Sequence, residues 1–142
     1  MNTIQKDLYS DVILGIRCGS YKGETIMAKP ILLYSVINMI EKRIIVNNRI
    51  PFDEETEKEY EETFKKTGIR VTPFFKPFYY LQYDGMWHFE WSSKNHETKR
   101  PSAKYIRENV QYAYLDNALW DLLQEQGMRD YFREIIENHY LK

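Results

Sequence analysis

Residues 78–91 read FYYLQYDGMWHFEW and contain the clearest structural signal of the sequence. Two runs of aromatic and apolar residues flank Asp84-Gly85, a pair that favours the two-residue turn of a β-hairpin. In that register Phe78, Trp87 and Phe89 share one face, which is the more apolar of the two. The sequence therefore predicts a central antiparallel hairpin over residues 78–91 that packs one face on the core.

Helical patterns lie on both sides of this hairpin. Apolar residues at every fourth position predict an amphipathic helix near the start of the chain, with the stripe Ile4, Leu8, Val12 and Ile16. Residues 30–43 are apolar on most sides, which is typical of a buried helix. Further helices are predicted at 54–66, where Asp53 can cap an acidic helix, at 102–107, and in two segments after residue 116. These elements predict an α+β fold, mostly helical, in a single domain over residues 1–142.

The composition limits the class of protein. A chain of 142 residues can bury one core, and its net charge of −1 means that nucleic-acid binding would need a local basic patch. The single cysteine, Cys18, excludes a disulfide within the chain and favours a reducing compartment. No signal-peptide pattern is present, and no apolar stretch approaches the ~20 residues of a membrane span. We therefore expect a cytoplasmic protein without a membrane segment.

The residue types that carry catalysis are scattered. The three histidines, His88, His96 and His139, lie far along the chain from Cys18, so no nucleophile, base and orienting group are grouped together. No HExxH, CxxC or EF-hand pattern occurs. The sequence therefore predicts no catalytic residue, no metal site and no cofactor.

Basic residues gather around the hairpin, whereas acidic residues gather in the helix after Asp53. Arg70 and Lys76 precede the hairpin, and a basic stretch follows it with Lys94, Lys99, Arg100, Lys104 and Arg107. The loop at residues 17–23 (RCGSYKG) adds cations and glycines that could offer charge and backbone N–H groups to a phosphate. Such cations bind phosphates, and nearby aromatic rings can stack on nucleotides. The distribution is compatible with a DNA-binding face on a near-neutral protein.

Four motifs occur in a recognisable order: KPILL at 29–33, NRIPFD at 48–53, PFYYLQYDGMW at 77–87 and YAYLD at 112–116. With the closing amphipathic helix, this order resembles the N-terminal DNA-recognition domain of bacterial HNH-type restriction endonucleases. That group is related to the sulfur-binding domains that recognise phosphorothioate-modified DNA. The resemblance covers nearly the whole chain and implies a domain that binds double-stranded DNA, either modified or of particular sequence, and delivers a nuclease to it.

The resemblance also implies where DNA would be bound. In the sulfur-binding relatives a Tyr-Pro pair helps to form an apolar pocket for sulfur; here Lys76 precedes Pro77, and a cation suits contact with an ordinary phosphate. Ala28 stands where a histidine often precedes Lys-Pro in those relatives. The predicted DNA contacts are Arg17, Lys22, Lys29, Lys76, Pro77, Tyr79, Gln82, Lys99 and Arg100. No His-Asn-His nuclease pattern follows, so we expect a stand-alone reader or a fragment of a longer enzyme.

A second hypothesis uses the same hairpin differently. Tyrosine and tryptophan are frequent anchors of protein interfaces, so a Tyr-rich hairpin could instead bind a partner protein or form a homodimer. The sequence does not predict the oligomeric state. DNA affinity should fall steeply with salt, whereas an aromatic protein interface should not, so a salt titration separates the two hypotheses.

Overall fold

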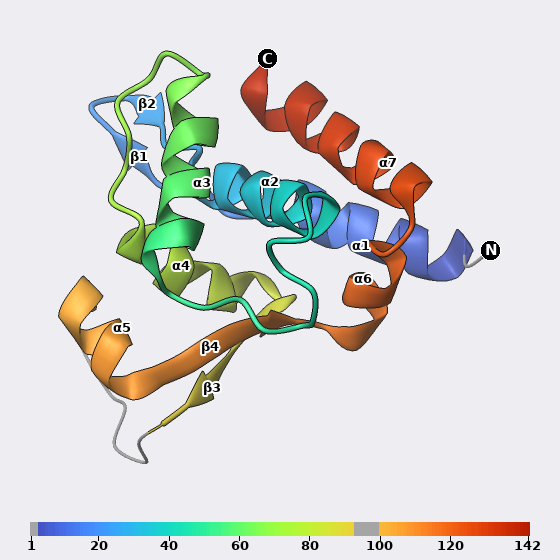
Figure 1. The fold of residues 1–142 in the computed structure, drawn as a ribbon. Helices are drawn as coiled ribbons and strands as arrows, with labels where there is room; N and C mark the ends of the chain where they lie inside the picture. Colours follow the sequence, from blue (N-terminus) through green and yellow to red (C-terminus); the bar gives the residue numbers. More distant parts are fainter. Residues whose placement is uncertain (1–2, 93–99) are drawn as a thin grey trace.

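Helix α2 (Ala28–Glu41) runs through the middle of the molecule and carries much of the core (Figure 1). The computed structural model describes residues 3–92 and 100–142. Side chains on several sides of α2, including Ile31, Leu33, Val36 and Ile37, are fully buried. This confirms the buried helix predicted from a sequence that is apolar around most of its circumference.

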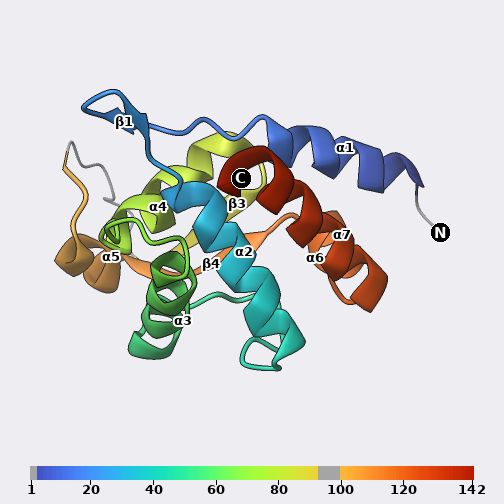
Figure 2. The ribbon, with the colours of Figure 1, turned by 90° about the horizontal axis from the view of Figure 1, so that it is seen from above.

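Other helices surround α2. Helix α3 (Glu54–Lys65) and helix α7 (Gln126–Ile136) both pack on it, while α1 (Thr3–Leu14) packs on α7 and on α6 (Asn117–Leu122) (Figures 1 and 2). Asp53 caps α3 as predicted, because its Oδ1 accepts a hydrogen bond from the backbone N–H of Thr56 at 2.9 Å. A turn of π-helix (Glu137–Leu141) extends α7.

The buried face of α1 differs from the predicted stripe. Ile4 and Leu8 are 81% and 51% exposed, whereas Tyr9 and Ile13 are buried. The Tyr9 hydroxyl donates a hydrogen bond to Asp116 Oδ2 at 2.7 Å, which directs this side of the helix toward the start of α6. The helix is present as predicted, and the second half of the stripe is confirmed, because Ile16 is buried and Val12 packs against the core. The first half of the stripe is exposed, and Tyr9 and Ile13 are buried instead.

The predicted hairpin over residues 78–91 is wrong. Its first half is helical instead, forming α4 (Phe75–Tyr80) and the 3₁₀ helix η1 (Leu81–Asp84). Pro77 is tolerated because it lies in the first turn of α4, where a backbone N–H has no partner within the helix. A type I′ turn needs positive φ at both central residues, but only Gly85, at φ 93°, has it; Gly85 ends η1 in the left-handed conformation.

The second half of the predicted hairpin is a strand whose partner is distant in sequence. Strand β3 (Trp87–Trp91) pairs antiparallel with β4 (Val110–Leu115), so that Trp87 lies opposite Leu115. Helix α5 (Ala103–Asn109) leads directly into β4, and Ile50 forms a single bridge to Ala113. The α+β class is therefore as predicted, with an antiparallel pair made by residues that are not neighbours in the chain.

An aromatic cluster joins α4 to this sheet. The Phe78 ring packs edge-on against Trp87 at 5.4 Å between centroids and stacks on Phe89 at 5.6 Å. The Trp87 indole N–H donates to the backbone oxygen of Phe78 at 2.8 Å. These three residues form the core that the sequence predicted, although Phe78 reaches it from a helix.

A second, unpredicted hairpin lies between α1 and α2. Strands β1 (Ser20–Tyr21) and β2 (Glu24–Thr25) are joined by Lys22 and Gly23, both at positive φ, as a type I′ turn requires. The sequence predicted only a loop here. Figure 2 shows this hairpin at one end of the molecule, beyond the first turn of α2.

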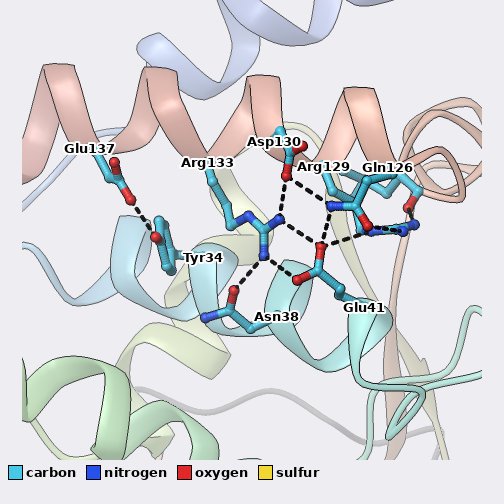
Figure 3. A network of polar contacts seen from close by, with 9 residues as sticks. Tyr34, Asn38, Glu41, Gln126, Arg129, Asp130, Arg133 and Glu137 are labelled. Carbon is cyan, nitrogen blue, oxygen red and sulfur yellow. Dashed lines mark hydrogen bonds and ion pairs between the residues drawn. The ribbon is translucent and has the colours of Figure 1, made fainter.

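A polar network fixes α7 against α2 (Figure 3). Arg133 makes a two-pronged contact with Glu41, with Nη2 at 2.7 Å from Oε1 and Nη1 at 3.1 Å from Oε2. Gln126 Nε2 donates to Glu41 Oε1 at 2.6 Å, and Arg129 Nε lies 3.5 Å from the same atom. These donors, with that of Arg133 first, lower the pKa of Glu41 to about 2.

We expect the Glu41→Gln variant to be less stable than the wild type at pH 7, and the difference to shrink in acid. The folded state lowers the pKa of Glu41, so its contribution is present above pH 4.5 and is lost as the pH falls toward 2. The Glu41 side chain is 35% exposed, so solvent screening limits the effect to about 1 kcal/mol. Urea unfolding at several pH values measures it, with the exposed Glu62→Gln as control; a difference that persists unchanged at pH 2 would contradict it.

Candidate nucleic-acid interface

A pocket of about 510 Å³ opens where the loop after α1, the first turn of α2 and the first turn of α4 meet. These segments are far apart in sequence and are brought together by the packing of α4 on α2. The pocket is lined by Arg17, Cys18, Gly19, Ile26, Ala28, Lys29, Thr72, Lys76, Pro77, Tyr80 and Tyr83. Four of the predicted DNA contacts, Arg17, Lys29, Lys76 and Pro77, therefore share one site.

A buried carboxylate organises one side of this pocket. The Asp84 side chain, 1% exposed, forms an ion pair with Lys29 Nζ at 2.8 Å and accepts the backbone N–H of Arg17 at 2.9 Å. Lys29 Nζ also donates to the Arg17 backbone oxygen at 2.9 Å. The charge of Lys29 is thus balanced within the protein, and the role of this lysine is to hold the loop at Arg17 in place.

Two other cations keep their charge available. Arg17 and Lys76 are exposed, and neither forms an ion pair with a carboxylate among residues 3–92 and 100–142. The Arg17 guanidinium donates to the backbone oxygen of Tyr83 at 3.2 Å, which fixes its position without neutralising it. The pocket therefore carries net positive charge.

The rest of the pocket wall is largely apolar. Its lining includes the buried residues Ala28 and Pro77, together with Ile26 and Tyr80. Cys18 is half-buried, and burial raises the pKa of its thiol, with Asp84 adding to the effect and Lys29 opposing it. Cations above an apolar wall suit a weakly hydrated anion, because the charge is met while little polar surface is left unpaired.

The remaining predicted contacts do not line this pocket. Lys22 lies at the tip of the β1–β2 hairpin, with its Nζ 5.4 Å from the centroid of the Tyr21 ring. Gln82 is half-exposed on η1, and Arg100 is exposed just before α5. Tyr79 is only 7% exposed and packs between the rings of Phe89 and Tyr105 in the core. Lys99 lies outside the described residues.

Sequence reasoning missed three contributors to the site. Tyr80 and Tyr83, which are 41% and 56% exposed at the pocket, lie in the segment that was predicted as the first strand of a hairpin. Asp84 was assigned to a turn. The helical spacing of Phe74, Phe78 and Leu81, all buried, was the signal that could have revealed a helix here.

A second polar cluster lies around Asp116, just before α6. Asp116 accepts from Tyr9 with one carboxylate oxygen and contacts His88 Nε2 with the other, next to a pocket of about 400 Å³. These contacts join α1, β3 and the start of α6, so we interpret the cluster as stabilising the fold.

Within the described part of the chain, no three His, Cys, Asp or Glu side chains are grouped to hold a metal ion. No helix of that part is long and apolar enough to cross a bilayer.

The fold is similar to that of a solved DNA-binding domain. The sulfur binding domain of ScoMcrA, complexed with phosphorothioated DNA, matches with a TM-score of 0.72 at 17% identity, over 93% of this chain and 86% of that chain. A structure of the sulfur binding and SRA domains of ScoMcrA, also with phosphorothioated DNA, matches with a TM-score of 0.70 at 17% identity, over 93% of this chain and 42% of that longer chain. No protein-family model and no curated protein matches. The likeness confirms the sulfur-binding-domain-like fold that the order of motifs predicted.

Proposed function

We propose that this domain binds double-stranded DNA and holds one backbone phosphate, or its sulfur-modified form, in the pocket at Pro77. One observation carries the proposal: Arg17, Lys29, Lys76 and Pro77 meet in a single pocket of a fold shared with a domain solved on phosphorothioated DNA. Arg17 and Lys76 would contact the charged oxygens. Such contacts supply a large share of the affinity of DNA-binding proteins and fix their register on the duplex.

The apolar wall gives the same pocket a basis for selectivity. A phosphorothioate replaces one oxygen by a larger and less strongly hydrated sulfur, which can lie against Ala28, Pro77 and Tyr80 without losing strong hydrogen bonds. An unmodified phosphate would leave a well-hydrated oxygen against the same wall. We therefore propose that the modified backbone binds more tightly, while Lys76 retains affinity for the unmodified one.

The domain acts in this proposal as a recognition module in the cytoplasm, and any DNA cleavage is supplied by a separate nuclease. The protein-interaction and homodimerisation alternative stays a hypothesis. Tyr79, Leu81 and Met86 of the predicted hairpin are buried, but Tyr80 and Tyr83 are exposed. The salt titration described above separates this alternative from DNA binding.

The Lys76→Glu variant tests the proposed contact with phosphate. It should bind duplex DNA about 10- to 100-fold more weakly and lower the slope of log affinity against log salt by about 0.9, because one phosphate contact is lost and a repulsive charge is added. Binding is measured by fluorescence anisotropy across a salt series, on duplexes with and without one phosphorothioate. Lys58→Glu, an exposed lysine of α3 that lines no part of the pocket, is the matched control. An unchanged salt slope for Lys76→Glu would argue against the contact.

The only cysteine of the sequence provides an independent test of where DNA binds. Cys18 lines the pocket, so bound duplex should protect it from alkylation by N-ethylmaleimide. Without DNA, the labelling rate should rise with pH through the neutral range, because burial raises the pKa of the thiol and only the thiolate reacts. Mass spectrometry follows the labelling. Equal rates with and without saturating duplex would place the binding site elsewhere.

A further inference from the structure

A second groove adjoins the pocket. It has a volume of about 460 Å³ and lies between the β1–β2 hairpin and residues 69–73, which run from the end of α3 past this hairpin to α4 (Figure 1). Ile26, Thr72 and Lys76 line both the groove and the pocket. The two form one continuous path across the surface.

The walls of the groove combine positive charge with exposed apolar surface. Arg70 is exposed, and no ion pair joins it to a carboxylate within the described residues; Glu24 is the one acidic residue of the lining. Tyr21 and Ile69 are 66% and 56% exposed at the groove. The far wall is anchored, because the buried Tyr60 donates its hydroxyl proton to the backbone oxygen of Thr72 at 2.7 Å.

We infer that this groove holds a phosphodiester adjacent to the one in the pocket, on the same DNA strand. Arg70 contacts the phosphate, and the exposed Tyr21 ring covers the neighbouring sugar. The groove and the pocket share Ile26, Thr72 and Lys76, so consecutive phosphates of one strand can occupy the two adjoining sites. Arg17, Arg70 and Lys76 against the single Glu24 give the path the charge that a nucleic-acid strand requires.

The inference rests on the proposed function and extends it to a second site, so its test removes charges one at a time. A methylphosphonate is uncharged, and it can be placed singly at each phosphate on either side of the phosphorothioate. In the wild type, one neighbouring methylphosphonate should weaken binding about tenfold; in Arg70→Ala that same position should change affinity by less than about twofold, because the partner charge is already absent. Lys58→Ala is the control and should retain the wild-type response at every position.

The outcomes separate the two proposals. If Arg70→Ala and the wild type respond alike to methylphosphonates at every position, the second site is overturned, the groove belongs to another occupant such as an extended peptide, and DNA binding at the pocket still stands. If the wild type binds neither modified nor unmodified duplex, the proposed function and the second site both fall. Loss of sensitivity at one position in Arg70→Ala alone supports the inference.

Discussion

Replacing Phe78 with alanine is expected to lower the free energy of unfolding by about 4 kcal/mol. Replacing a buried phenylalanine by alanine typically costs about 3–5 kcal/mol. The Phe78 side chain is fully buried and lies at the centre of the aromatic cluster. Its ring contacts those of Phe52, Phe74, Trp87 and Phe89, with centroids 5.0 to 5.6 Å apart. The cavity would open between α4 and the β3–β4 sheet, where Phe78 meets Trp87 and Phe89.

Urea unfolding measures this loss. Tyr80→Ala, two residues along the same helix and 41% exposed, is the matched control and should cost less than about 1 kcal/mol. If Phe78→Ala does not fold, Phe78→Leu should still fold and cost about 1–2 kcal/mol, because it removes part of the same buried volume. Equal losses for Phe78→Ala and Tyr80→Ala would contradict the central position of the Phe78 ring.

The burial of Phe78 and Trp87 was predictable, whereas their backbone conformations were not. A run of aromatic residues fits both the two-residue period of a strand and the 3.6-residue period of a helix. Phe78 and Tyr80 alternate as in a strand. Phe74, Phe78 and Leu81 have helical spacing, and these are the residues that the structure buries. Asp84-Gly85 fits a hairpin turn and a helix end alike. The true partner of Trp87 is Leu115, and a pairing over that distance leaves no local trace in the chain.

The sequence was enough to predict which cations lie at the site, but it did not predict how the surrounding residues are arranged. The motif around Lys29 and the pair Lys76-Pro77 indicated two walls of the pocket, and the loop at Arg17 indicated a third. Tyr79 was included as a contact on the predicted hairpin. In helix α4 its side chain is buried in the core instead. The role of Asp84 at the site was not predicted, because an acidic residue before a glycine normally indicates a solvated turn.

Asp84→Asn is expected to lower the free energy of unfolding by about 3 kcal/mol, toward the lower end of the cost of breaking a buried ion pair. The asparagine can still accept the Arg17 N–H, but it leaves Lys29, 17% exposed, without an opposite charge. The exposed Asp121→Asn should change stability by less than about 0.5 kcal/mol.

The same substitution should weaken DNA binding although Asp84 is too buried to touch DNA. Asp84 and Lys29 together hold the backbone of Arg17, so without the pair the loop must be ordered at the moment of binding, at a cost that we expect to reduce affinity about tenfold. Lys29→Met in the Asp84→Asn background removes the unpaired charge, so the double variant should be more stable than the sum of the two single losses predicts. Urea unfolding of all four proteins and anisotropy on one duplex supply both readouts. Additive stability losses would mean that Lys29 and Asp84 act independently, and unchanged affinity would mean that DNA does not use the loop at Arg17.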